Sequence, residues 1–289
     1  MRIKFRDGAC TGVLRACALV TGLAFAASHA MAGDSTTIHK RLQADPAGQV
    51  QVSNTSGTVV VSGWDRKEVE VTGELGEDSE RLEFDISGKL TKIKVILPKR
   101  GSSDDTDLTI RIPSGSSLSV NTVSADIEVQ GVRGAQRLQT VSGDISVKGQ
   151  GKPGLLTITT VSGDAQVHNV AGEVNGNTVS GNFNFSLSDT SRSRLRTTSG
   201  DLAMKTRLTG DARLDVESIS GDVRLDLLGK PNAEFDVSSF NGEIRNCFGP
   251  KPARTDEYAP GRELQFREGQ GSARVRIKTL NGDISFCNK

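Results

Sequence analysis

The residues whose spacing could support chemistry are acidic side chains, with one asparagine, that recur in a repeated motif. Each stands directly after a glycine or its equivalent: Asp126, Asp144, Asp164, Asn182, Asp201, Asp222, Glu243 and Asp283. Clustered carboxylates are ligands for hard cations, so such a row could hold Ca²⁺. Calcium takes about six to eight oxygens, however, and no second acidic row accompanies this one. Because aspartate also favours turns by accepting hydrogen bonds from nearby backbone amides, the pattern predicts turn residues and no metal site.

Two cysteines occupy equivalent places in the same motif. Cys247 lies five residues after Gly242, and Cys287 lies five residues after Gly282. If residues 249–272 are an inserted loop, the cysteines belong to adjacent coils of a stack, within the ~4.4–6.8 Å Cα separation of a disulfide. A hidden coil between them would separate the Cα atoms by ~9.6 Å, which is too far. The prolines and glycines of 249–272 favour the loop, so we predict a Cys247–Cys287 disulfide.

Catalytic motifs are missing from the sequence. After residue 32 the only histidines are His39 and His168. No nucleophile elbow, zinc motif, phosphate-binding loop or dinucleotide fingerprint is present. The serines recur with the repeat, which assigns them to corners of the fold. The sequence therefore predicts no catalytic residue, no cofactor and no enzyme.

A basic run is the nearest approach to a local site. Its members are Arg192, Arg194, Arg196, Lys205 and Arg207. Repeat proteins that cleave polysaccharides carry a charged cluster on an outer face, so a carbohydrate-active β-helix enzyme is the alternative function. Long basic side chains also lie along solvated faces with their heads in water, and the sequence favours this interpretation.

The elements that position these residues are short strands on either side of a repeated corner. The motif is Thr or Ser, an apolar residue or Thr, Ser or Asn, Gly, and then Asp, Asn or Glu. The corner glycines are Gly143, Gly163, Gly181, Gly200, Gly221, Gly242 and Gly282. Counted from Ala125, which takes the glycine place in an earlier copy, the steps are 18, 20, 18, 19, 21, 21 and 40 residues. Steps this regular predict a repeat architecture.

Apolar and polar residues alternate on both sides of each corner, as in strands with one buried face. Leu156 and Ile158 precede one corner, and Ile145 and Val147 follow another. With 32 glycines and only 4% aromatic residues, the composition favours a thin core that is repeated many times. Strands this short bury an apolar face only when coils stack ~4.8 Å apart.

The predicted fold is therefore all-β, a single β-solenoid that resembles a parallel β-helix with coils of ~19 residues. In such a stack the Thr or Ser before each corner would form a ladder of hydroxyls that can bond one another. A meandering antiparallel sandwich is the alternative fold. It would not require the same residue type at the same phase of every repeat.

The predicted organisation has four parts. Residues 1–32 are a signal peptide, 33–47 a tail, 48–106 an irregular N-terminal β cap, and 107–289 the solenoid repeats with an inserted loop at 249–272. A cap is expected because the first coil of a solenoid exposes an unpaired edge. The motif copy Asn54-Thr55-Ser56-Gly57 is read as a degenerate outlier within this cap.

The first 32 residues have the features of a secretory signal. Basic residues within 2–6 precede an apolar run over 13–27, and Ala30-Met31-Ala32 gives the small-residue cleavage pattern. A membrane anchor is the alternative, but the run is shorter than the ~20 residues that span a bilayer. We therefore expect a periplasmic, secreted or cell-surface protein with no membrane insertion after cleavage. Without residues 1–32 the chain has 32 basic and 34 acidic residues, a balance that gives no reason to expect nucleic acid as a partner.

Residues 107–127, followed by the Ser-Gly-Asp corners, resemble a known bacterial family. Together with Val50–Gly57 and Gly63-Trp64-Asp65, they are similar to the β-strand-repeat family described as putative adhesins, a domain of unknown function. The resemblance covers most of residues 48–289 and carries no catalytic residue. It implies a non-catalytic interaction or structural protein of the envelope, whose repeated surface would bind a glycan, peptidoglycan or protein. Repetition would multiply weak contacts into useful avidity.

Overall fold

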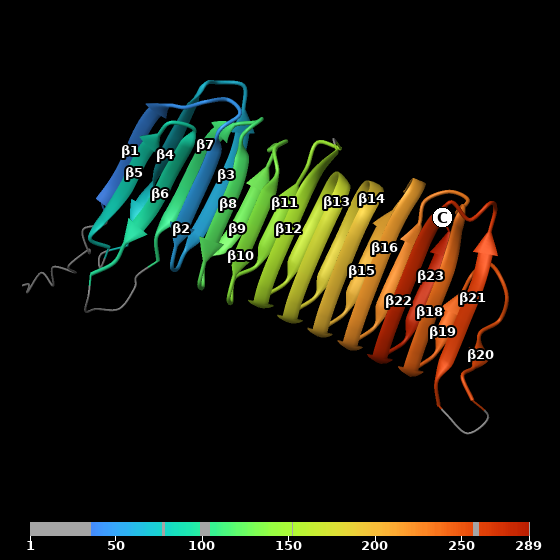
Figure 1. The fold of residues 1–289 in the computed structure, drawn as a ribbon. Coiled ribbons are helices and arrows are strands. Elements are labelled where there is room, and N and C mark those ends of the chain that lie inside the picture. The colour runs from blue at the N-terminus through green and yellow to red at the C-terminus, as the bar shows by residue number, and fades with distance from the viewer. Residues whose placement is uncertain (1–35, 77–78, 99–104, 152, 257–259, 289) are drawn as a thin grey trace, which may run out of the picture. The chain divides into compact units, whose positions relative to one another are not determined.

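The computed structural model of the chain describes residues 36–76, 79–98, 105–151, 153–256 and 260–288. These residues form 23 strands joined in one sheet, and no helix (Figure 1). The described part of the chain thus holds no helix able to cross a membrane. The expected signal peptide, residues 1–32, lies outside the described residues.

A single coil shows how the repeats are built. Strand β10 (Gln136–Thr140) leads into the corner at Gly143, and β11 (Ile145–Lys148) leads away from it. In the next coil, Ile158 lies opposite Leu138 and Ala165 lies opposite Ile145, with both pairs of strands parallel. Equivalent residues of successive repeats are therefore hydrogen-bonded neighbours, and the fold is all-β and solenoid-like.

We call the strands that lead into corners sheet I and the strands that leave them sheet II. The long strands β13 and β14 each contribute their first half to sheet II and their second half to sheet I. In spatial order, the parallel strands of sheet I are β6 (Leu90–Ile96), β2 (Gln49–Asn54), β8 (Ser117–Thr122), β10, β12 (Pro153–Ser162), β13 (Ala165–Ser180), β14 (Phe183–Ser199), β16 (Leu208–Ser220), β22 (Ala273–Asn281) and β18 (Ala233–Asn241). Those of sheet II are β7 (Asp107–Pro113), β3 (Thr58–Trp64), β9 (Asp126–Gln130), β11, β13, β14, β15 (Leu202–Thr206), β17 (Val223–Leu227), β23 (Ile284–Asn288) and β19 (Ile244–Asn246).

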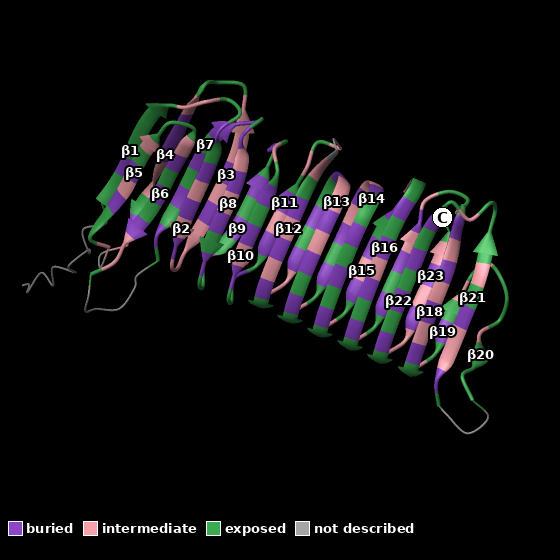
Figure 2. Ribbon diagram, viewed as in Figure 1, coloured by how far each residue is buried: buried purple, intermediate pink, exposed green. Residues whose placement is uncertain are grey.

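Buried and exposed residues alternate along the strands of both sheets (Figure 2). The core between the two sheets consists of one layer of side chains from each sheet. A small residue in one layer therefore leaves space that a large residue of the other layer fills. A Cβ at Gly176 would lie 2.9 Å from the ring of Phe183. Phe183 stacks on Phe185 with ring centroids 5.1 Å apart, and both rings are fully buried. These rings occupy the volume that glycine leaves in sheet I.

The corners stack so closely that a side chain does not fit. At all seven predicted corner glycines, an added Cβ would lie 2.0–2.2 Å from the carbonyl oxygen of the neighbouring corner. Gly200 is an example: its Cβ would lie 2.2 Å from the oxygen of Gly181, and its φ of +136° also disfavours other residues. Backbone contact between coils is the reason for the recurring glycine.

The N-terminal part departs from the prediction. Strands β2 and β3 form a full coil that pairs in parallel with β8 and β9, and Ser124 donates its N–H to the oxygen of Thr55 at 2.7 Å. The copy Asn54-Thr55-Ser56-Gly57 is thus a stacked corner and not a degenerate outlier. The regular spacing of the motif did not identify this corner, because residues 65–116 lie in the sequence between this coil and the coil that it contacts.

The cap lies on the far side of that coil. Strands β6 and β7 pair in parallel with β2 and β3. Antiparallel strands then continue both sheets at this edge. In sheet I, β5 (Arg81–Ser87) pairs with β6. In sheet II, β4 (Glu68–Leu75) pairs with β7, and β1 (Thr36–Gln43) pairs with β4. Part of the expected tail 33–47 is therefore a strand, and β7, expected among the repeats, belongs to the cap.

The C-terminal part departs in a similar way. Strands β22 and β23 pair with β16 and β17 on one side and with β18 and β19 on the other. The coil that comes later in the sequence is therefore inserted between two earlier ones. The segment 249–272, predicted as a loop, contains β20 (Ala253–Arg254) and β21 (Arg262–Glu268), and β21 pairs antiparallel with β18. Strand β21 forms because Phe266 stacks on Phe235 with ring centroids 4.7 Å apart, while Leu264 is buried.

Candidate functional site

Cys247 and Cys287 form a disulfide, with their Cα atoms 4.9 Å apart. They meet because β19 and β23 are paired neighbours, with Asn246 opposite Phe286. The bond joins the end coil of the stack to the inserted coil beside a cluster of phenylalanine rings. It acts on the architecture of this end and contributes no reactive thiol.

The acidic row forms a hydrogen-bond chain between coils. Oδ1 of each Asp or Asn accepts the backbone N–H of the acidic residue in the next coil, at 2.7–2.9 Å. Asn182 does this as well as aspartate does, so the contact needs an oxygen and no charge. Among the described residues, no three His, Cys, Asp or Glu side chains are grouped to hold a metal ion. The row therefore stabilises the corners.

The expected hydroxyl ladder is not formed. Thr160, Thr178, Thr197, Ser218 and Thr279 have buried hydroxyls without a hydrogen-bond partner in the described part of the chain. Coils ~4.8 Å apart place equivalent atoms beyond the ~3 Å reach of an O–H···O hydrogen bond, so these hydroxyls cannot bond one another. Where hydroxyls of this row do bond, they meet the backbone: Thr140 accepts from Gly143 N–H at 3.0 Å.

The second residue of the motif points outward and forms an exposed apolar row that we call the corner ridge. Its members are 44–54% exposed: Val123, Val141, Val161, Val179, Ile219, Phe240 and Leu280. The sequence analysis did not identify this row. The alternation could have found it, because a buried Thr or Ser immediately before it sends the next side chain outward.

The predicted basic run is divided by the fold. Lys205 lies on sheet II, and Arg207 pairs with Asp189 at 3.6 Å. Arg192, Arg194 and Arg196 are exposed on the outer face of sheet I, on the second half of β14. The run is therefore not one site.

The fold instead aligns Arg192 with arginines from other coils. Arg192 lies opposite Arg213 on β16, and Arg213 lies opposite Arg274 on β22. We call these three exposed residues the arginine row. Each stands five residues before the Thr or Ser of its motif, a regularity that could have revealed the row from the sequence.

The arginine row is only partly compensated by direct ion pairs, although Glu173 lies opposite Arg192 on the neighbouring strand β13. Arg274 contacts Glu234 at 3.5 Å, and Glu234 also accepts from Arg267, whose hydrogen bond lowers the pKa of that carboxyl. Within the described residues, neither Arg192 nor Arg213 makes an ion pair. Like charges directly opposite on neighbouring strands are destabilising.

Two adjoining grooves follow the arginine row on this face. One, of ≈ 640 Å³, is lined by Asn175, Asn177, Arg194 and Arg196, among others. The second, of ≈ 390 Å³, reaches Glu234 and Arg274. Both grooves are lined by Glu173, Arg192 and Arg213. The result is an open polar surface across at least three coils.

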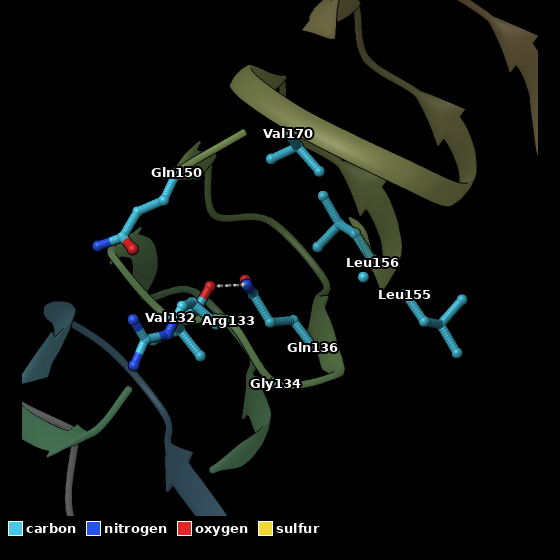
Figure 3. A pocket seen from close by; sticks show the side chains of 10 residues that line it. Val132, Arg133, Gly134, Gln136, Gln150, Leu155, Leu156 and Val170 are labelled. Carbon is cyan, nitrogen blue, oxygen red and sulfur yellow. Dashed lines mark hydrogen bonds between the residues drawn. The ribbon is translucent and has the colours of Figure 1, made fainter. Parts of the chain in front are cut away.

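A separate cavity lies among the turns that join the coils (Figure 3). Val132, Leu156 and Val170 line it, and Gln136 Nε2 donates to the oxygen of Val132 at 2.9 Å. Gln136 Oε1 has no partner within the described residues. The volume of ≈ 20 Å³ has room for about one water, so this cavity is too small for a sugar.

A charged cluster in the cap is structural. Buried Glu70 accepts hydrogen bonds from Arg41 and from His39, and Arg111 lies 3.2 Å away. The hydrogen bond from Arg41, followed by that from His39, lowers the pKa of Glu70 to about 2. His39 is thus held by a carboxylate that joins β1, β4 and β7, and His168 lies elsewhere, on β13.

The chain is similar to solved bacterial structures. A "putative adhesin" from Bacteroides fragilis has 10% identity and a TM-score of 0.50, over 88% of this chain and 98% of that one. A "putative lipid binding protein" from Parabacteroides distasonis has 12% identity and a TM-score of 0.40, over 89% and 98%. A "putative adhesin" from the same organism has 11% identity and a TM-score of 0.35, over 87% and 98%. The first likeness supports the fold.

No curated protein matches the chain. The family model of Toastrack DUF4097 matches residues 74–286, which is most of the sequence and includes all eight stacked corners from Ala125 to Gly282. The predicted resemblance to the β-strand-repeat family of putative adhesins is confirmed. The chain belongs to the Toastrack DUF4097 family.

Proposed function

We propose that this protein is an exported, non-catalytic component of the cell envelope that binds an envelope glycan, peptidoglycan or protein through the outer face of sheet I. The observation that carries the proposal is the pair of adjoining grooves on that face, which share Arg192 and Arg213. Open grooves across several coils suit a long polymer better than a small molecule, which proteins usually enclose. The adhesin names of two structural neighbours agree with this class of function.

The same proposal treats the stack as a parallel β-helix with coils of ~19 residues. In-register parallel pairing of successive coils supports it. Each coil then presents equivalent side chains at a fixed spacing, so one polymer can make the same weak contact several times. Multivalent contact of this kind raises affinity without a deep pocket.

Export is part of the proposal. Residues 1–32 would direct it as a signal peptide, and the Cys247–Cys287 disulfide fits an oxidising compartment such as the periplasm or cell surface.

The test is capture of envelope material by protein purified from the exported fraction. We compare the wild type with Asn177→Trp, which fills the larger groove, and with Gln166→Trp, an equally exposed position on sheet II. The proposal expects the captured glycan, peptidoglycan or protein to be lost only with Asn177→Trp. Capture that both variants retain, or lose equally, contradicts a role for this face. New reducing or unsaturated ends in the glycan fraction would instead establish the alternative, a carbohydrate-active enzyme.

A further inference from the structure

We infer that the arginine row binds carboxylates of an acidic glycan that lies along the stack, across the strands of sheet I. This inference rests on the proposed function and names the class of its ligand. Arg192, Arg213 and Arg274 are opposite one another on three adjacent parallel strands. Their backbones are therefore ~4.8 Å apart, a spacing comparable to the length of one sugar ring in an extended glycan.

Guanidinium groups suit this ligand. Arginine presents a planar fork of donors that can bind both oxygens of a carboxylate, which adds geometric specificity to charge attraction. Three forks in one line would contact acidic groups on successive or alternate sugars. Arg194, beside the row in the larger groove, offers a further donor without an ion pair in the described part of the chain.

The arginine row is less completely ion-paired than other arginines of this face. Elsewhere on the same face the fold pairs its arginines: Arg196 contacts Glu217 at 2.8 Å, and Arg276 contacts Asp236 at 3.2 Å. Arg192 and Arg213 face each other and make no direct ion pair in the described part of the chain, although Glu173 lies opposite Arg192 on β13. Residues that serve binding often lower stability, and a bound anion would remove this repulsion.

The surroundings favour a glycan over other polyanions. Glu173, Asp211 and Asp215 line the same grooves and can accept hydrogen bonds from sugar hydroxyls, as can the oxygens of Asn175 and Asn177. Those carboxylates would repel the dense charge of polyphosphate. Single-stranded nucleic acid usually stacks its bases on aromatic side chains, and neither groove has one among its described lining residues.

The experiment titrates polygalacturonate, neutral dextran, polyphosphate and single-stranded DNA into the purified protein by calorimetry. The variants are Arg213→Gln, the triple Arg192→Gln/Arg213→Gln/Arg274→Gln, and the control Arg137→Gln, an exposed arginine on β10 of the same face. We expect the wild type to bind polygalacturonate, with affinity that falls as salt rises. Arg213→Gln should lose at least about 10-fold, the triple variant more, and Arg137→Gln nothing. Tighter binding of polyphosphate or DNA overturns the inference.

Thermal melting is a second measurement, which distinguishes loss of binding from loss of the folded structure. The triple variant should melt close to the wild type, because relief of the repulsion between Arg192 and Arg213 offsets loss of the exposed Arg274–Glu234 ion pair. Polygalacturonate should raise the melting temperature of the wild type only. A triple variant that still binds polygalacturonate overturns the inference. If the wild type ignores polygalacturonate but keeps envelope capture that Asn177→Trp abolishes, the ligand class is wrong and the proposed function stands.

Discussion

Oδ1 of Asp222 accepts the backbone N–H of Asp283 at 2.8 Å, although 61 residues separate them in sequence. The acidic residue of the next motif copy, Glu243, donates instead to Asp283, also at 2.8 Å. These two hydrogen bonds record the order of the coils, in which the coil of Asp283 lies between those of Asp222 and Glu243. The periodic contacts of the stack thus continue without interruption through a rearranged chain.

The disulfide should stabilise the rearranged end. Replacing Cys247 and Cys287 by serine, singly or together, is expected to lower the free energy of unfolding by about 2–4 kcal/mol, because the bond limits the unfolded chain. Urea unfolding followed by circular dichroism measures this change. Single and double variants should match, since each removes the same bond. Reductant should affect only the wild type, and an unchanged wild-type midpoint would contradict the prediction.

The corner glycines should not tolerate a methyl group. Gly200→Ala would place a Cβ 2.2 Å from the oxygen of Gly181 at a φ of +136°, and we expect it to destabilise the protein by more than about 1 kcal/mol. Gly210→Ala is the matched control, because a Cβ there has no atom within 4 Å. Chemical denaturation of both variants provides the comparison. Equal stability would show that corner contact is not limiting.

The acidic row should need an oxygen acceptor and no negative charge. Asp201 Oδ1 accepts the N–H of Asp222 at 2.8 Å, and Asn182 makes the equivalent bond to Asp201 at 2.9 Å. Asp201→Asn should therefore leave stability almost unchanged, whereas Asp201→Ala should cost about 1 kcal/mol. Thermal melts with and without calcium complete the test. A calcium-dependent rise that Asp201→Asn removes would favour a metal site instead.

The cap should be sensitive to acid. Because Arg41 and His39 hold the pKa of Glu70 at about 2, well below its ordinary 4.5, the ionised carboxylate is worth more to the folded state than to the unfolded state. This contribution is fully present above about pH 4.5 and is lost as the pH falls toward 2. Urea midpoints between pH 6 and 2.5 should fall less steeply for Glu70→Gln than for the wild type. The control Glu74→Gln, at an exposed position of the same strand, should keep the wild-type slope.

Much of the architecture follows from local pattern. The alternation of Leu156 and Ile158, and the glycine of each corner, are consequences of strands that stack directly on their own repeats. The order of the coils could not be predicted in this way. Nothing in the spacing of the motif distinguishes a coil that is added to an end from one that is inserted between two others, because both make the same hydrogen bonds. The aromatic contacts of Phe235 with Phe266 and Phe286 depend on that order.

The candidate site was hidden for a related reason. Arg192 was visible in the sequence as part of a basic run, but Arg213 and Arg274 lie 21 and 82 residues further along the chain and become its neighbours only by stacking. Aligning the repeats by their corners would have placed all three in one column. Net charge could not reveal them, because acidic residues elsewhere balance the total.

The inserted coil also constrains how the molecule is made. Strands β16 and β18 are synthesised before β22. In the folded protein, however, β22 lies between them and pairs with both. If each coil paired with the preceding one as soon as it was synthesised, β18 would pair with β16. The position that β22 occupies in the folded protein would then be blocked. At this end of the stack, β22 must therefore be synthesised or translocated before β16 and β18 can complete their pairing. Until β22 arrives, two unpaired strand edges are open to wrong partners, so this end is where chaperone protection would be needed most.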